Sequence, residues 1–192
     1  MQNTYRVPAA GLSQQALTAQ LAAAGPESVA KRKKKAVGQE GRIALASLSR
    51  RLSAAYARCG ARERGAVGAQ AAFPLLERTL KELLEEQELF EGLPVMAGGE
   101  YDGRPRVVRL AEEVVQLCAG KLTEELIVRA VEAYQTDNAL TISELWGLLA
   151  AFRLALVRLG TAQACEEARR QASRERAARI FGRAGALEEG EA

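Results

Sequence analysis

Residues 141–160 read Thr-Ile-Ser-Glu-Leu-Trp-Gly-Leu-Leu-Ala-Ala-Phe-Arg-Leu-Ala-Leu-Val-Arg-Leu-Gly, and they carry the clearest helix signal of the chain. Thr141 and Glu144 stand three residues apart at its start, which is the spacing of a capping box. In that motif the threonine hydroxyl accepts a hydrogen bond from the glutamate N–H, and the glutamate carboxylate accepts one from the threonine N–H. The pair therefore predicts that a helix begins here.

The helix predicted after this box is apolar around most of its circumference. Its large apolar residues recur at alternating spacings of three and four: Ile142, Leu145, Leu149, Phe152, Leu156 and Leu159. Trp146, Leu148 and Ala155 widen that surface. Because such a helix normally lies at the centre of a bundle, we expect Trp146 and Phe152 in the core. Burial of each side chain should contribute a few kcal/mol to stability.

The location of the chain follows from its charges. Arg153 and Arg158 argue against a membrane span, since each would cost roughly 3 kcal/mol near the centre of a bilayer. The first 24 residues lack a basic start followed by an apolar run, so no signal peptide is predicted. We expect no transmembrane segment and a cytoplasmic location, with peripheral contact at the inner membrane left open.

Outward from this stretch, apolar stripes predict further helices. They cover residues 39–59, 69–91, 105–119 and 123–135. Pro74 is expected in the first turn of its helix, where its missing N–H costs nothing. The chain is 48% hydrophobic and only 5% aromatic, which favours packed helices. We predict an all-α fold: an irregular multi-helix bundle, with a Gly-rich loop at 92–104 before the three best-patterned helices and no sheet.

Composition divides the chain into three parts. Residues 1–40 are expected to form a weakly ordered basic leader, with a short helix from Ser13 to Ala24 and a basic block from Lys31 to Lys35. Residues 41–160 form the helical bundle. Residues 161–192, rich in Ala, Arg, Glu and Gln, are expected to form a charged helical tail.

Several kinds of chemistry are excluded. The chain has no histidine, so a Ser-His-Asp triad, a Cys-His dyad and a Cys/His zinc site are absent. Cys59, Cys118 and Cys165 are far apart and favour free thiols. The glutamates of residues 82–91 are interpreted as a solvated face, and residues 92–104 match neither a Walker loop nor a dinucleotide loop. We predict no catalytic residue, no cofactor and no metal.

An ordered series of short motifs runs through the loop and the last three helices of the bundle. The series is Leu93-Pro94, Ala97-Gly98-Gly99, Gly103, Pro105-Arg106-Val107, Leu110-Ala111, Glu113-Val114-Val115, Lys121-Leu122, Glu125-Leu126, Ala133-Tyr134-Gln135, Leu140-Thr141-Ile142, Glu144-Leu145-Trp146, Phe152-Arg153-Leu154 and Leu156-Val157. Its order and spacing resemble the N-terminal helical region of cyclic β-1,2-glucan synthases. In that family Ala-Tyr-Gln ends one helix, and Leu-Thr-Ile-Gly-Glu-Leu-Trp-Ala opens the next. The match covers residues 93–160 and extends loosely from residue 70.

The resemblance implies an origin more than an activity. Those synthases are large inner-membrane enzymes that polymerise glucose from UDP-glucose and cyclise the product, and the matched region lies ahead of the transferase. The resemblance therefore implies a non-catalytic helical accessory or interaction module, including a truncated or split fragment of such an enzyme. Its partners would be other domains of a glucan synthase system.

Three residues of the loop region are candidates for a contact with a partner or a glycan: Tyr101, Arg104 and Arg106. Sugar recognition typically needs an aromatic platform with polar neighbours, and Tyr101 beside Arg104 supplies one. The competing interpretation is a loop that only joins two helices.

Two other functions stay open. The chain could be an independent helical scaffold that binds nucleic acid or anionic lipid through Lys31–Lys35, although the formal net charge is only +3. A free-standing enzyme of glycosyl transfer or hydrolysis would need paired carboxylates, and no paired-acid motif is present.

Overall fold

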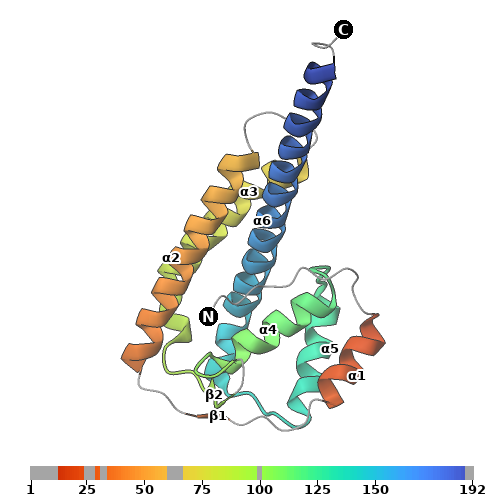
Figure 1. Cartoon of the computed structure of the whole chain (residues 1–192). Coiled ribbons are helices and arrows are strands. Elements are labelled where there is room, and N and C mark those ends of the chain that lie inside the picture. The colour runs from red at the N-terminus through yellow and green to blue at the C-terminus, as the bar shows by residue number, and fades with distance from the viewer. Residues whose placement is uncertain (1–12, 24–28, 31–33, 60–66, 99–100, 189–192) are drawn as a thin grey trace.

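The computed structural model (Figure 1) describes all residues except 1–12, 24–28, 31–33, 60–66, 99–100 and 189–192. Its elements are α1 (Gln14–Ala23), β1 (Val29–Ala30), α2 (Lys34–Cys59), α3 (Val67–Glu85), the 3-10 helix η1 (Gln87–Phe90), β2 (Val95–Met96), α4 (Arg106–Leu117), α5 (Glu124–Gln135) and α6 (Ile142–Glu188). The predicted all-α, multi-helix fold is confirmed.

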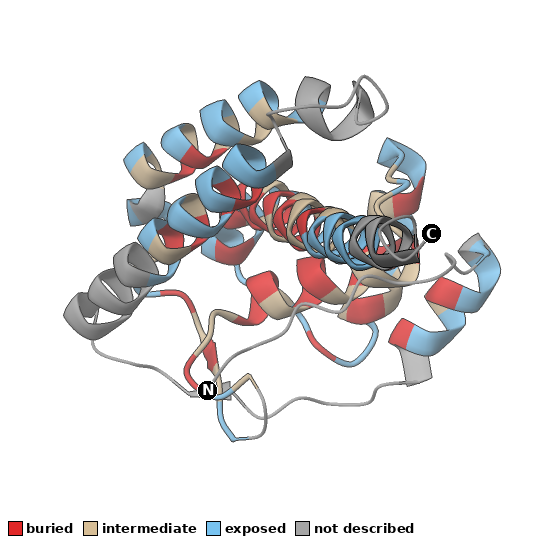
Figure 2. Ribbon diagram, turned by 45° about the horizontal axis from the view of Figure 1, so that its top comes forward, coloured by how far each residue is buried: buried red, intermediate tan, exposed pale blue. Residues whose placement is uncertain are grey.

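Helix α6 is the axis of the molecule. It contacts α4, α2 and α3, and Figure 1 shows α2 and α3 along one flank while α4 crosses near the N-terminal end of α6. Buried residues, red in Figure 2, concentrate where these helices meet, and the far part of α6 is exposed. The predicted central position of this helix is therefore correct.

The N-terminal part of the chain takes part in the core. Helix α1 packs against α5, and its Leu17 and Leu21 are fully buried within the main hydrophobic cluster. Residues 14–23 of the expected leader therefore form a helix that packs into the bundle. Of the basic block, residues 31–33 lie outside the described residues, and the backbone of Lys34 and Lys35 opens α2.

The loop before α4 is folded into short backbone pairings. Strands β1 and β2 pair antiparallel, with Val29 opposite Met96, so a minimal ribbon is present where no sheet was predicted. The Met96 N–H donates to Arg104 O at 2.9 Å, and the Gly103 N–H donates to Met96 O at 2.9 Å. These bonds return the chain to the start of α4, which fixes where Arg104 and Arg106 leave the backbone.

Helix α4 ends as its glycine predicts. Gly120 has a φ of +78°, and its N–H donates to Val115 O at 2.9 Å. This positive φ is costly for residues that carry a Cβ. A Cβ at Gly120 would also lie 2.9 Å from Cδ2 of Leu159, so the turn packs closely on α6.

Helix α6 passes the predicted boundary at residue 160 without a break. Thr161, Ala162 and Ala168 are buried, so the packed part of the helix continues to Ala168. From Arg169 to Ile180 nearly every residue is exposed. The charged tail therefore begins about eight residues later than composition suggested. By length and composition, α6 contains one stretch that could cross a membrane, and 56% of that stretch is buried inside the bundle.

Helix α3 differs from its prediction at Pro74. The helix begins at Val67, so Pro74 lies inside it and not in the first turn. A proline there leaves the carbonyl four residues earlier without its helical partner. The neighbouring Phe73 stacks on Tyr56 of α2, with ring centroids 3.9 Å apart, which ties the two helices together at this point.

Candidate functional site

A buried ion pair joins the starts of α4 and α6. Arg106 follows Pro105 at the beginning of α4, and Glu144 lies in the first turn of α6. The Arg106 guanidinium donates from Nε to Glu144 Oε1 at 2.9 Å and from Nη2 to Oε2 at 2.8 Å. Both side chains are buried, and Glu144 has no exposed surface. This two-point geometry fixes the angle between the two helix starts.

The same carboxylate completes the predicted capping box. Glu144 Oε2 accepts from the Thr141 N–H at 2.9 Å and from the Thr141 hydroxyl at 3.0 Å. Thr141 Oγ1 accepts from the Glu144 N–H at 3.3 Å. The capping box is confirmed. Arg106 Nη2 also donates to Ala139 O at 2.9 Å, so the pair is embedded in hydrogen bonds of the kind that a buried charge requires.

Arg106 was predicted to contact a partner or a glycan, and that prediction is wrong. Its guanidinium faces the interior because Glu144 holds it there. Burial disfavours its charged form, but the hydrogen bonds and charge of Glu144 outweigh this effect and raise the pKa of Arg106 above its ordinary value. Nearby, burial raises the pKa of Tyr134 to about 12, against a smaller lowering effect of Arg106.

Tyr101 and Arg104 do come together, as predicted. The Arg104 guanidinium carbon lies 5.5 Å from the centre of the Tyr101 ring, and that of Arg109 lies 5.8 Å from it. Tyr101 and Arg104 are both partly exposed. Both guanidiniums thus lie close enough to the tyrosine ring for cation–π attraction, which stabilises the loop.

Glu112 anchors this loop to the bundle and was not identified from the sequence. It lies on α4 and is almost fully buried. Its Oε2 is 3.6 Å from Nη1 of Arg104, and its Oε1 pairs with Nη1 of Arg158 on α6. The sequence gives only a weak sign of this role, because Glu112 is followed directly by a second glutamate, Glu113, and nothing in the sequence shows which of the two is buried.

Trp146 is not in the core, which corrects the prediction. Its side chain is 77% exposed, whereas Phe152 is 3% exposed, as predicted. Ile142 is 75% exposed, Leu149 is 70% exposed, and Leu145 is about half as exposed as either. We call these four residues, Ile142, Leu145, Trp146 and Leu149, the outer stripe. Their spacing of i, i+3, i+4 and i+7 places them on one face of α6.

The physical reason is the rotation of α6 about its own axis. Glu144 points inward, and Trp146, two residues later, lies about 200° further round the helix. The inner face carries Ala151 and Ala155, both without exposed surface, together with Phe152. Small residues allow the neighbouring helices to approach closely, so the largest side chains of the first turns remain outside.

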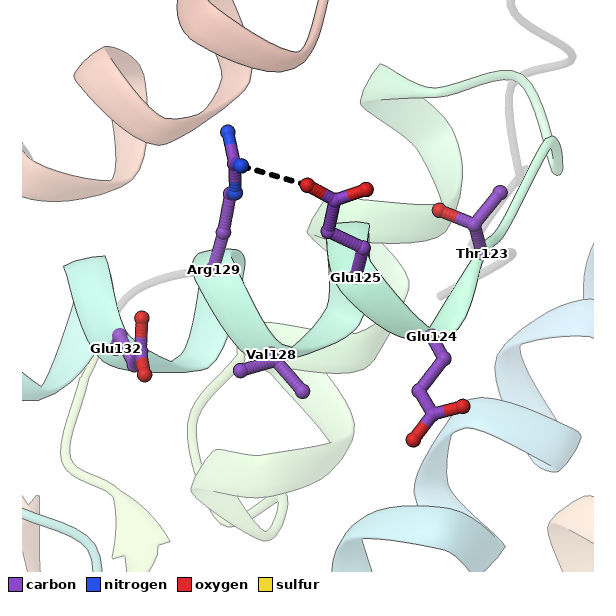
Figure 3. A pocket seen from close by; sticks show the side chains of 6 residues that line it. All are labelled: Thr123, Glu124, Glu125, Val128, Arg129 and Glu132. Atoms are coloured by element: carbon purple, nitrogen blue, oxygen red, sulfur yellow. Dashed lines mark hydrogen bonds and ion pairs between the residues drawn. The ribbon is translucent and has the colours of Figure 1, made fainter.

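A shallow pocket lies on the outer face of α5 (Figure 3). It is lined by Thr123, Glu124, Glu125, Val128, Arg129 and Glu132. Arg129 pairs with Glu125 at 2.6 Å, while Glu124 points away from that pair. The carboxylates do not converge on one point. Among the described residues, no group of three or more acidic or cysteine side chains could hold a metal ion.

Comparison of the chain with protein-family models, with curated proteins and with solved structures gives no match.

Proposed function

We propose that this protein is a non-catalytic helical interaction module that docks a partner through the outer stripe. One observation carries the proposal: the first two turns of α6 present Ile142, Trp146 and Leu149 to solvent, each at least 70% exposed. Contiguous exposed apolar groups of this size usually mark interaction sites. Tryptophan is also enriched among the residues that dominate binding energy at protein interfaces.

The outer stripe has the rigid support that a docking surface needs. Directly behind it, the Arg106–Glu144 pair fixes the start of α6 against α4. A surface that is already in place loses little conformational entropy when a partner binds. Burial of a Leu, Ile or aromatic side chain is worth about 1.5–3 kcal/mol, so four of them give a useful gross driving force for association.

The partner follows from the family resemblance. Residues 93–160, which resemble the helical region of cyclic β-1,2-glucan synthases, contain the loop, the ion pair and the outer stripe. We therefore propose other domains of a glucan synthase system as the partner, in the cytoplasm or at the inner face of the inner membrane. The module would position that partner, and the chemistry would belong to the partner. The buried acids are both engaged by arginines: Glu112 pairs with Arg104 and Arg158, and Glu144 pairs with Arg106.

Calorimetry against the purified soluble domains of a cyclic β-1,2-glucan synthase tests the proposal. We expect association that the Ile142→Ser variant weakens at least about tenfold. Ile180→Ser is the matched control, because Ile180 is equally apolar, lies on the same helix and is 68% exposed. No association, or equal weakening by both variants, would contradict the proposal. Titration of β-1,2-glucan in the same instrument tests Tyr101 and Arg104 as a glycan contact.

Binding to nucleic acid or anionic lipid is the second candidate function. The exposed stretch of α6 from Arg169 to Arg179 favours it, because five arginines and one glutamate lie there. Some of these arginines pair within the helix, as Arg170 does with Glu166 at 3.2 Å, which reduces the charge offered to a partner. This function predicts binding that falls steeply with salt and that weakens when Lys31–Lys35 are neutralised.

A further inference from the structure

Helix α3 covers the same face of α6 that carries the outer stripe, but further along the helix. Arg153, four residues after Leu149, pairs with Glu82 and with Glu86 of the α3 region, the latter at 3.0 Å. At Gly160, a Cβ would lie 2.9 Å from the side chain of Leu76 on α3. Because α3 ends at Glu85, its cover stops before it reaches the outer stripe.

Beyond that point the chain turns aside instead of continuing over α6. A Cβ at Gly147 would lie 3.3 Å from Cδ1 of Leu93 and 3.5 Å from the carbonyl oxygen of Leu89. The segment that contains η1 therefore flanks the outer stripe and leaves it uncovered. A helix laid in line with α3, at the usual separation of about 8–10 Å from α6, would cover it.

The chain segment that flanks the outer stripe is rich in glutamate. Four glutamates lie between the end of α3 and the residue after η1, and we call them the acidic rim: Glu85, Glu86, Glu88 and Glu91. Glu85 and Glu88 are exposed. The last turn of α3 contains no basic residue. The C-terminal end of a helix carries partial negative charge, so the dipole of α3 adds to the attraction for a cation.

From these two features we propose that the outer stripe takes an amphipathic helix with a basic flank. This rests on the function proposed above. The apolar face of the partner covers Ile142, Trp146 and Leu149, and its lysines or arginines lie along the acidic rim. The partner extends the line of α3, in the way that an amphipathic helix commonly fills a groove.

The acidic rim also distinguishes this occupant from a second copy of the chain. Two copies that met through their outer stripes would bring two acidic rims into one interface, and like charges across an interface oppose association. A basic helix meets the opposite condition. Charge complementarity therefore favours a different protein as the partner.

Trp146, the single tryptophan of the chain, reports the interaction directly. Two synthetic peptides, each about 18 residues long so that helix can form, carry leucines at i, i+3, i+4 and i+7. One has lysine on its flanks and the other has glutamate. With the full chain we expect the lysine peptide to give a saturable blue shift of Trp146 fluorescence. We expect the glutamate peptide to bind at least about tenfold more weakly.

Variants assign that binding to its two components. Ile142→Ser should weaken binding of the lysine peptide about tenfold, and the control Ile180→Ser should leave it unchanged. The double variant Glu85→Gln/Glu88→Gln should weaken it about threefold and reduce its dependence on salt. Circular dichroism confirms that each variant keeps the helical fold.

Four results would overturn the proposal, and each has a distinct meaning. Equal binding of both peptides removes the basic flank but leaves the outer stripe as a docking surface. Absence of binding by either peptide rejects the amphipathic helix, while the synthase-domain calorimetry still decides the proposed function. If the chain sediments as a dimer and Ile142→Ser abolishes that dimer, the occupant of the outer stripe is a second copy of the chain. A blue shift with uncharged lipid vesicles transfers it to a bilayer.

Discussion

The first two turns of α6 have two faces with opposite chemistry. The inner face carries the charged Glu144, which has no exposed surface, and the outer face carries Trp146 and Leu149, which are among the most exposed large apolar residues described. In most water-soluble domains this distribution is reversed. The buried ion pair and the small inner residues Ala151 and Ala155 together account for the way the helix faces.

This comparison separates folding from recognition. Glu144 accepts hydrogen bonds from Arg106 on α4 and from Thr141, so its loss should lower the stability of the whole bundle. Trp146 makes no comparable contribution to the interior, so its loss should be felt by a partner. Mutations at the two faces should therefore affect different measurements.

The largest expected effect is at the inner face. Arg106→Met should reduce the free energy of unfolding by about 3–5 kcal/mol, because it leaves the Glu144 carboxylate buried without its cation. Urea unfolding followed by circular dichroism measures this. The control is Arg129→Met, which removes an exposed pair with Glu125 and should cost at most about 1 kcal/mol. A comparable, small cost for both variants would show that the ion pair does not set the rotation of α6.

The second test compares the two aromatic residues of α6. Phe152→Ala should cost about 3–4 kcal/mol of stability, since it empties a buried site. Trp146→Ala should change stability by no more than about 0.5 kcal/mol, as for most exposed positions. It should also remove binding of the lysine peptide, which calorimetry measures because this variant lacks the fluorescent reporter. Thermal and urea unfolding of both variants decide this. If Trp146→Ala cost as much as Phe152→Ala, the outer stripe would be part of the core.

The smallest of the three effects is a pH dependence that arises from Tyr134 on α5, near the ion pair. The pKa of Tyr134 is raised from 10.0 to about 12 by burial, so the folded state favours the neutral phenol. The unfolded state loses this proton first. The resulting stability is complete below pH 10 and is lost as pH rises toward 12, by about 2–3 kcal/mol. Urea unfolding at several pH values should show this slope, and Tyr134→Phe should remove its contribution. An unchanged slope in that variant would place the effect elsewhere.

The sequence predicted features that depend on near neighbours. The capping box of Thr141 and Glu144, the turn at Gly120 and the contact of Tyr101 with Arg104 each involve residues a few positions apart, and all three are present. The all-α fold class and the central position of α6 were predicted from the spacing of apolar residues. Local patterns of this kind do not depend on the rest of the fold.

The sequence failed where the answer depended on distant partners. Arg106 and Glu144 are 38 residues apart, and nothing in either segment alone shows that they pair. Because that pair was not foreseen, the face of α6 with the large side chains Ile142 and Trp146 was expected to be buried. The buried face instead contains the small residues Ala151 and Ala155. The burial of Leu17 in α1 was missed for the same reason, because it depends on packing with α5.

The length of helix α6 sets the distance and the direction of its exposed end. Its 47 residues form one unbroken rod about 70 Å long, and only the part up to Ala168 is gripped by the bundle. Each residue in a helix advances the axis by about 1.5 Å and turns it by about 100°. One alanine inserted just after Ala168 would leave the docking surface untouched yet swing the far arginines by more than a quarter turn. The number of residues in the exposed part of α6 thus sets both how far the arginines lie from the bundle and the direction in which they point.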